Sequence, residues 1–271
     1  MFAEFIVYLP SATELGVMLT IHQMKYPEIT SLYKYRAFNE LSLQSLINEI
    51  AWFSKPELFN DPFDCGIYVD EGKIEESIRA AVEIAYEKSG NDKSQIPEND
   101  LTVKENDKVA FNRFRESVYS LIQSSGVFSL SAVNNDILMW GHYADSHKGF
   151  CIEYLRDGEN ILGKQADPVI YQNELPSLSV QDVTSHGAGV DSLFFTKSSH
   201  WSYEKEWRVI SPEGNKALQF PCPIKSIIFG MKMNEQNRYT IKQILKDRRV
   251  QFKEAVKDDQ SFALQICNIQ A

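Results

Sequence analysis

The sequence predicts an α+β protein built on a mainly antiparallel sheet. Two amphipathic helical segments, at about 73–88 and 105–124, lie in the first half of the chain, and short apolar runs typical of strands dominate the second half. Helices and strands segregated in this way favour an α+β fold over a regular alternation of parallel strands and helices. The sequence contains no glycine-rich phosphate loop of the P-loop or dinucleotide-binding kind.

The individual elements follow from hydrophobic periodicity and from turn residues. The segment 31–37 is rich in β-forming residues, Asn39 is placed to cap a short helix, and 51–54 is a second strand that runs into an ordered, proline-containing turn at 55–65. Beyond the two long helices we expect one further helix at 234–247 and strands at 127–130, 149–155, 169–171, 193–196, 207–210, 224–230, 250–254 and 262–267.

We expect one folded domain, because the candidate functional residues are spread over most of the chain. Residues 1–30 are expected to be an N-terminal extension, with Tyr26 and Pro27 at its boundary. Residues 31–271 are expected to form a single α+β domain with a helical insertion at about 73–124.

The N-terminal stretch from Phe5 to Ile21 is fairly apolar, but Pro10 and polar residues interrupt it. It has no basic leader and no run of about 18 apolar residues, so neither a signal peptide nor a membrane span is predicted. We therefore expect no membrane association and a cytoplasmic location.

The composition indicates a folded protein with an acidic overall charge. Of the 271 residues, 43% are hydrophobic and 24% are charged, and the formal net charge is -9. This charge repels phosphate backbones and argues against general coating of nucleic acids. The 4 cysteines include no Cys-x-x-Cys pair, so neither a disulfide framework nor a zinc-site spacing is indicated, and Cys151 is expected to be a small buried hydrophobe.

The first polar group of interest lies on the first predicted strand. Because strand side chains alternate, Lys34 and Arg36 share one face and Tyr33 and Tyr35 share the other. An arginine on a rigid strand is suited to hold a phosphate or carboxylate with two hydrogen bonds. An exposed face with two solvated cations is the alternative.

Two further polar groups lie on or beside later strands. Ser129 and Ser131 share one face, where small hydroxyls leave room for a ligand and can orient a carboxylate. Glu204 and Glu206 also project together, and neighbouring carboxylates make useful acids, bases or hydroxyl-orienting groups. Taken alone, each pair is more typical of an ordinary polar strand face.

Taken in chain order, these groups resemble the aromatic-Arg, Ser-x-Ser and Glu-x-Glu motifs of the Arg-Ser-Glu class of ADP-ribosyltransferases. In that family the arginine contacts the phosphates of NAD, the serine strand shapes the nicotinamide pocket, and the second glutamate positions the nicotinamide ribose. The resemblance implies these roles for Arg36, Ser129 and Glu206, with Glu204 addressing the acceptor. It also implies mainly antiparallel, split β-sheets around a cleft that binds NAD.

The chain departs from that family at two points. Leu130 occupies the middle of the serine motif, and the 75 residues from Ser129 to Glu204 exceed a minimal fold. A wider resemblance, to a bacterial domain family of unknown function, covers about 31–211. It rests on four blocks: Leu32 to Arg36, Trp52 to Asp64 with its Phe-Asn-Asp-Pro-Phe-Asp core, Ser129 to Phe150, and Lys197 to Ile210.

The segment 137–149 has the spacing of a short buried helix flanked by His142 and His147. Its rings are interpreted as structural or as ligand-stacking groups. The expected catalytic residues are therefore Glu206 and Glu204, and the expected NAD-binding residues are Arg36, Tyr35, Ser129, Ser131, Trp140, His142 and Tyr143.

The leading hypothesis is an NAD-dependent ADP-ribosyltransferase-like enzyme that modifies an unidentified macromolecule, with NAD as substrate and no metal. A toxin or phage-defence role fits such an enzyme by analogy. One alternative is a metal-assisted hydrolase or nuclease that uses His142, His147, Asp61 and a glutamate. The other is a non-enzymatic module in which Arg36 and the tryptophans recognise a phosphorylated small ligand. The acceptor and the oligomeric state do not follow from the sequence.

Overall fold

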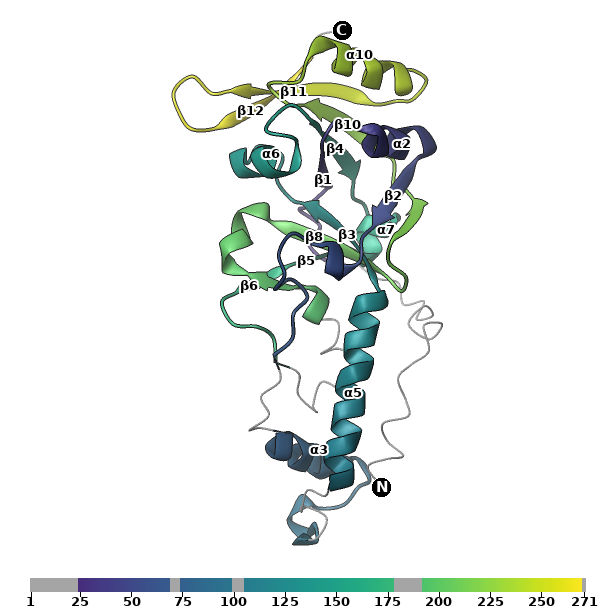
Figure 1. Ribbon diagram of the computed structural model, residues 1–271, viewed down its shortest axis with the longest axis vertical. Helices are drawn as coiled ribbons and strands as arrows, with labels where there is room; N and C mark the ends of the chain where they lie inside the picture. The colour runs from purple at the N-terminus through teal and green to yellow at the C-terminus, as the bar shows by residue number, and fades with distance from the viewer. Residues whose placement is uncertain (1–23, 69–73, 99–104, 178–191, 270–271) are drawn as a thin grey trace. The chain divides into compact units, whose positions relative to one another are not determined.

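The computed structural model describes residues 24–68, 74–98, 105–177 and 192–269 (Figure 1). The chain divides into two structural units, each made of segments distant in sequence. The first unit includes 56–125 and 172–198, and the second includes 20–55, 126–171 and 199–271. Most of the expected N-terminal extension, residues 1–23, lies outside the described residues.

An eight-stranded sheet forms the second unit, with strand order β12-β11-β10-β4-β1-β3-β8-β5. Neighbouring strands are antiparallel except β10 and β11, which are parallel and are connected through helix α10 (Glu235–Ile244), as a parallel pair requires a crossover. The α+β class and the mostly antiparallel sheet are thus confirmed. The strands are β1 (Ser31–Arg36), β3 (Gly126–Ser131), β4 (Phe150–Leu155), β5 (Asp167–Pro168), β8 (Glu206–Ser211), β10 (Ile224–Phe229), β11 (Gln251–Lys257) and β12 (Leu264–Asn268).

The sheet is nearly interrupted between β1 and β3. Within these described strands, their register consists of the pair Tyr33 and Ser131 alone, whereas β1 pairs with β4 along its whole length. Side chains make further links, since Lys34 Nζ donates to the carbonyl of Ser129 at 2.6 Å and Tyr35 Oη to that of Val133 at 2.9 Å. The split β-sheets that the transferase resemblance implies are therefore joined into one sheet, with five strands on one side of this junction and three on the other.

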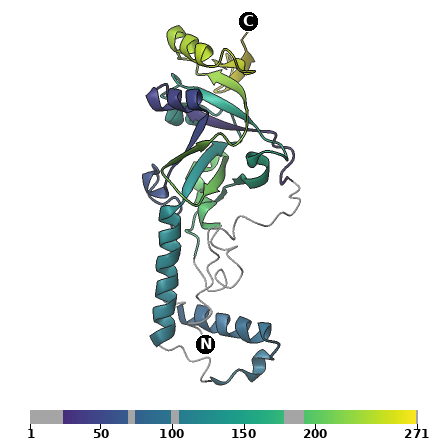
Figure 2. The ribbon, with the colours of Figure 1, turned by 90° about the vertical axis from the view of Figure 1, so that its right-hand side faces the viewer.

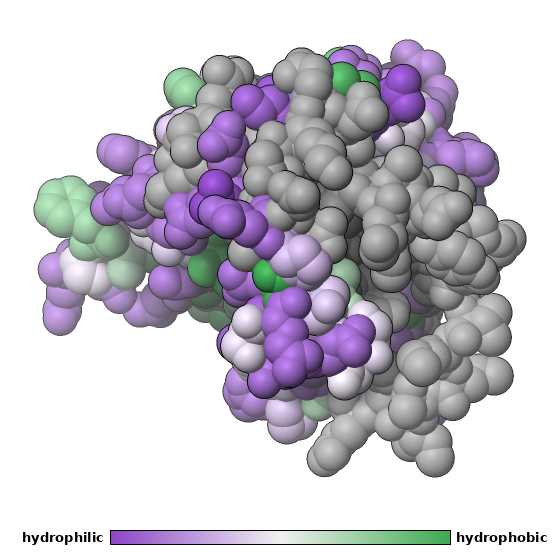
Figure 3. Space-filling view, turned by 90° about the horizontal axis from the view of Figure 1, so that it is seen from below, coloured by the Kyte–Doolittle hydropathy of each residue, from purple (hydrophilic) through white to green (hydrophobic). Residues whose placement is uncertain are grey.

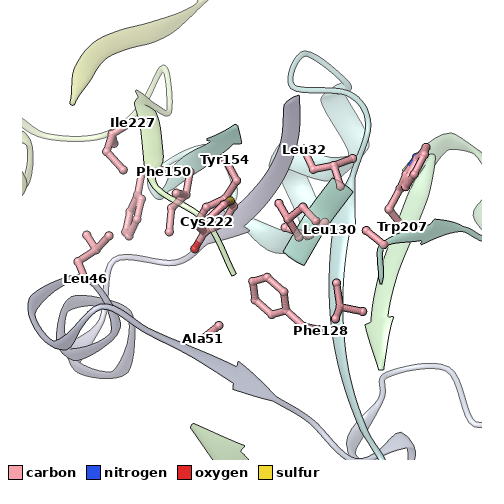
Figure 4. Close-up of a cluster of buried hydrophobic side chains, with 14 of the residues drawn as sticks. Leu32, Leu46, Ala51, Phe128, Leu130, Phe150, Tyr154, Trp207, Cys222 and Ile227 are labelled. Atoms are coloured by element: carbon pink, nitrogen blue, oxygen red, sulfur yellow. The ribbon is translucent and has the colours of Figure 1, made fainter. Parts of the chain in front are cut away.

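One face of this sheet carries the larger hydrophobic core (Figure 4). Leu32, Phe128 and Phe150 project from the sheet, and Leu46 of α2 (Glu40–Asn48) and Ala51 of β2 (Ile50–Phe53) meet them. Full burial of each large apolar side chain contributes about 1.5–3 kcal/mol. Helix α7 (Ile161–Gln165) also contributes to this core, and β9 (Lys216–Gln219) pairs with β2.

Helix α6 (Ile137–Tyr143) packs on the opposite face of the sheet. Asp136 caps it, because its carboxylate accepts hydrogen bonds from the amides of Leu138 and Met139 at 2.9 Å. Trp140 is completely buried and contacts the Tyr35 ring edge-on at 5.2 Å between centroids. The buried helix expected in this segment is therefore present, and its aromatic side chain anchors it to β1.

The chain before β1 is fixed to the second unit by Arg156, which is 1% exposed. Its guanidinium donates to the carbonyls of Lys25, Tyr26 and Ile29 and stacks on the ring of Trp207, 4.7 Å from the centroid. The last residues of the expected extension, 24–30, are thus part of the folded second unit.

The first unit contains the two long predicted helices, α3 (Ile74–Lys88) and α5 (Glu105–Ser124). Figure 2 shows α3 lying across the N-terminal end of α5, where Lys108 and Glu75 form an ion pair at 3.2 Å. The remaining described elements include η2 (Pro56–Leu58), η4 (Lys93–Gln95) and β7 (Thr196–Ser198) in this unit, η5 (Ser199–Glu204) in the second, and β6 (Ile170–Gln172) where the chain passes between them.

The strand expected at 193–196 is wrong in its position, because residues 192–194 are helical and the strand follows as β7.

On the side of the molecule that Figure 3 shows, the described residues are mainly hydrophilic and the hydrophobic areas are small and separate. No helix in the described part of the chain is both long enough and apolar enough to cross a membrane.

Candidate functional site

A row of polar side chains crosses the sheet on the face that carries α6. Ser226 pairs with Glu153, Glu153 with Tyr33, Tyr33 with Ser131, and Ser131 with Glu206. Because directly paired residues of a sheet project to the same face, these five side chains form a continuous line across β10, β4, β1, β3 and β8. We call this line the polar row.

Glu204 lies at one end of the polar row and is 3% exposed. Tyr143 Oη of α6 donates a hydrogen bond to Glu204 Oε1 at 2.5 Å, and Ser131 Oγ of β3 donates to the Glu204 carbonyl at 2.6 Å. Lys205 follows in the left-handed region, with φ of 45°, which turns the chain from η5 into β8. Tyr143 therefore holds the carboxylate of Glu204, and Ser131 holds its backbone.

Glu206, the second glutamate of the motif, is in a buried ion pair with Arg208. Arg208 Nε lies 2.8 Å from Glu206 Oε1, and Arg208 Nη2 lies 3.0 Å from Oε2. Arg208 is 0% exposed and Glu206 is 5% exposed. This two-bond geometry compensates the charge of Glu206, so the two glutamates occupy different environments: Glu204 beside a tyrosine hydroxyl and Glu206 beside a guanidinium.

Aromatic rings gather around Glu204. The His142 ring lies 6.3 Å from the Tyr143 ring and 6.3 Å from the Tyr203 ring, and Trp201 is 6.1 Å from Tyr203, measured between centroids. His142 is exposed and the other three rings are partly exposed. Flat rings that reach solvent beside a buried carboxylate are suited to stack against a planar ligand.

Arg36 does not lie with Ser129, Ser131 and Glu206. It pairs with Phe150 in the register, and alternation along β1 puts its side chain on the face of the larger core. Burial lowers the pKa of its guanidinium, and its Nε is buried without a hydrogen-bond partner in the described part of the chain. The alternation of β1 was predicted, but the convergence of this arginine with the serine and glutamate motifs is not observed.

The other residues expected to bind NAD are divided between the Glu204 end of the polar row, β3 and a smaller hydrophobic cluster beside α6. Ser131, His142 and Tyr143 lie at the Glu204 end, as described above. Ser129 is partly exposed and pairs with Arg208. Tyr35 and Trp140 are 5% and 0% exposed and belong to the smaller hydrophobic cluster beside α6, where their contact joins α6 to β1.

A second polar centre, missed in the sequence, lies at the other end of the polar row. Glu153 is 2% exposed and accepts hydrogen bonds from Ser31 Oγ at 2.9 Å and Ser226 Oγ at 2.5 Å. Its oxygens also lie 2.7 Å from Lys225 Nζ and 2.7 Å from Lys253 Nζ. The signal was a charged residue inside the apolar strand β4, Phe-Cys-Ile-Glu-Tyr-Leu.

The residues of the alternative metal site belong to different structural units. His147 stacks on Trp140 with centroids 6.5 Å apart, and Asp61 belongs to the first unit, where its carboxylate accepts from the Phe63 amide at 2.9 Å. In the part of the chain that the structure describes, no three His, Cys, Asp or Glu side chains are grouped to hold a metal ion. The sharp turn expected around Asn60 and Asp61 is present and includes η2.

The Phe-Asn-Asp-Pro-Phe-Asp block lies in the first unit. Its last aspartate, Asp64, is ion-paired with Lys197 at 3.4 Å, and both side chains are at most 5% exposed. A small pocket beside this pair is lined by Asn60, Cys65 and Gln123, among others. The polar blocks that the wider resemblance joined are therefore distributed over both units.

Comparison with known proteins gives one match. Residues 139–209 match the model of a family described as a protein of unknown function, DUF2971. The matched segment includes Tyr143, Glu153, Glu204 and Glu206, and so contains residues from both ends of the polar row. The resemblance to a domain family of unknown function is thus shown over this segment. No curated protein and no solved structure matches the chain.

Proposed function

We propose that this protein transfers ADP-ribose from NAD to a macromolecule and that the reaction takes place at the Glu204 end of the polar row. The observation that carries the proposal is the hydrogen bond from Tyr143 to Glu204 beside Ser131 and Glu206. It brings the Ser-x-Ser and Glu-x-Glu motifs together on one face, next to rings that reach solvent.

The chemistry of the transfer calls for a fixed carboxylate. As the bond between nicotinamide and ribose breaks, positive charge develops on the ribose, and a carboxylate held in place stabilises that charge without reorganisation. Glu204 is held by Tyr143 on α6 and through its carbonyl by Ser131 on β3. We therefore assign the charge-stabilising role to Glu204. Glu206, paired with Arg208, is assigned the role of fixing the first residue of β8.

The rings of His142, Tyr203 and Trp201 supply a stacking surface for the nicotinamide ring in this proposal. Arg36 lies on the opposite face and is given no role at this centre.

The direct test is release of nicotinamide from NAD in the presence of cell extract, together with transfer of label from adenine-labelled NAD to macromolecules. We expect both activities in the unmodified protein. The Glu204→Gln variant is expected to lower kcat by roughly 100-fold, because it removes the charge that stabilises the transition state. Tyr143→Phe, which frees Glu204 from its hydrogen bond, is expected to have a smaller effect in the same direction.

Glu213→Gln is the matched control, since Glu213 is a surface glutamate with 71% of its side chain exposed and is paired with Lys216. Circular dichroism shows whether each variant is folded. If the unmodified protein consumes no NAD and labels nothing, the transferase proposal fails. Binding of NAD without turnover, unchanged in Glu204→Gln, would instead assign a ligand-binding module.

A further inference from the structure

The structure brings two lysines to one buried carboxylate at the far end of the polar row. Lys253 comes from β11 and Lys225 from β10, and their Nζ atoms lie 2.7 Å from different oxygens of Glu153. The Lys225 side chain is 41% exposed and that of Lys253 is 18% exposed. The carboxylate is therefore covered by its partners, while the ammonium groups reach solvent.

Lys225 reaches this face through an irregularity of its strand. Ile224 pairs with Tyr154 and Ser226 with Glu153, so Lys225 is an extra residue opposite consecutive positions of β4. Such a bulge re-aims a side chain, and without it alternation would send Lys225 away from the face that carries Ser226. The local backbone is thus built to bring a second cation to Glu153.

The cluster has charge and hydrogen-bonding capacity to spare. Two ammonium groups face one carboxylate, which leaves one positive charge uncompensated within the cluster. Among the described residues, Lys225 donates to Glu153 and to Ser31 Oγ at 3.0 Å, and Lys253 donates to Glu153 alone. Since each ammonium group has three donors, one remains on Lys225 and two remain on Lys253.

We propose that Lys225 and Lys253 form a binding site for a phosphate group. A phosphate oxygen accepts charge-assisted hydrogen bonds from ammonium groups, and an anion with more than one such oxygen can use the spare donors of both lysines. Glu153 keeps the two ammonium groups side by side, but its negative charge also competes with a bound anion for them.

The phosphate site is separate from the Glu204 centre. Glu206 on β8 and Glu153 on β4 are three strand spacings apart along the polar row, about 14 Å. Tyr33 lies between them. Burial, together with the nearby charge of Glu153, raises the pKa of the Tyr33 hydroxyl to about 12. Its hydroxyl therefore stays protonated and available as a donor along the row. The phosphate proposal does not depend on the transferase proposal.

Isothermal titration with inorganic pyrophosphate, on the full chain, tests the site. We expect saturable binding that weakens about tenfold or more in Lys225→Gln and in Lys253→Gln, as loss of a hydrogen bond from a charged group predicts. Lys253→Arg, which keeps the positive charge, is expected to retain most of the affinity of the unmodified protein. Lys246→Gln is the matched control, because it removes the same charge from an exposed residue that follows α10 in the chain.

Glu153→Gln gives an opposite and therefore diagnostic expectation. This variant keeps a side-chain oxygen that can accept hydrogen bonds from the lysines and removes the competing negative charge, so it should bind pyrophosphate more tightly than the unmodified protein. A parallel titration with ADP identifies the source of the phosphate. Equal affinities assign the site to the phosphate groups alone, and a higher affinity for ADP assigns it to a nucleotide.

The proposal is overturned if the unmodified protein does not bind pyrophosphate, or if Lys225→Gln and Lys253→Gln bind no more weakly than Lys246→Gln. It is also overturned if folded Glu153→Gln loses binding as the lysine variants do, since the cluster would then be a structural ion pair. None of these outcomes depends on NAD turnover, so the two proposals fail or stand separately.

Discussion

At the scale of single residues, Glu153 shows how a charge is stabilised inside a sheet. Burial alone would raise the pKa of this carboxyl group, but hydrogen bonds from Lys225, Lys253, Ser226 and Ser31 lower it to about 2. The carboxylate is therefore ionised at every pH at which the protein is expected to work. Its hydrogen-bond and ion-pair partners offset the free energy that is lost when the carboxylate is removed from water.

This pKa predicts a specific loss of stability in acid. A carboxyl group with a pKa of about 4.5 when unfolded and about 2 when folded stabilises the protein above pH 4.5, and this contribution is lost as the pH falls toward 2. It is on the order of 3 kcal/mol. Urea denaturation at a series of pH values, with unmodified protein and Glu153→Gln, measures it.

The Glu153→Gln variant should be less stable at neutral pH and should lose less free energy of unfolding between pH 4.5 and 2. Glu159→Gln, at a position where 97% of the side chain is exposed, should follow the unmodified protein in slope. Identical slopes for Glu153→Gln and the unmodified protein would show that Glu153 is not the group that titrates.

At the scale of elements, two glycines let three stretches of backbone meet at the end of the sheet. A Cβ on Gly149 would lie 2.1 Å from the Arg36 carbonyl oxygen, and one on Gly230 would lie 2.2 Å from that of His147. The turn that contains His147 is itself unusual, because the non-glycine residues Asp145, Ser146 and His147 all have positive φ. Its position after α6 therefore depends on this close approach.

Gly230→Ala is expected to destabilise the protein by about 3 kcal/mol, because the new methyl group meets backbone atoms that cannot turn aside. Gly141→Ala, in α6, meets nothing within 4 Å and should stabilise the protein by about 0.5–1 kcal/mol. Thermal and urea unfolding compare the two variants. A Gly230→Ala protein as stable as the unmodified one would contradict the packing described for this turn.

Local signals predicted most of the elements. Asn39 caps α2 as expected, its side chain accepting from the Ser42 amide at 2.9 Å, and the alternation along β1 and β3 is confirmed. The strands β5 and β9 were not predicted. Each is short and its residues pair with distant segments, β9 with β2 and β5 with β8, so their structure comes from a partner and not from a local pattern.

The candidate site was predictable only in part, for a related reason. The sequence indicated which side chains share a face within one strand, but not how one strand is registered against the next. Tyr33 pairs with Ser131, and this register places both tyrosines of β1, not Arg36, on the serine face. Likewise, the bulge that brings Lys225 to Glu153 has no signature in the sequence.

At the scale of the whole sheet, the weak joint between β1 and β3 separates two cooperative parts. Backbone hydrogen bonds along an entire strand resist opening together, whereas β1 and β3 share one register pair and rely on side chains such as Lys34. The polar row crosses this joint, so the relative movement of the two parts would change the distance between its ends.

Lys34→Met is expected to loosen this joint by removing the hydrogen bond to the Ser129 carbonyl. Hydrogen exchange measured by mass spectrometry should become faster in peptides from β3 and β8, on the order of tenfold, which corresponds to one such bond. Peptides from β4 and β10 should change little. Lys246→Met is the control, and uniform acceleration in all strands would contradict a separate opening of the three-stranded part.

The burial of the thiols makes the protein suitable for site-directed labelling without prior engineering. Cys65, Cys151 and Cys222 are buried, and burial raises the pKa of Cys151 well above its usual value and that of Cys222 to about 12, so little reactive thiolate forms there. Cys267, on the edge strand β12, is partly exposed. A maleimide dye should therefore attach first at this position, which gives a reporter on the same sheet as Lys253.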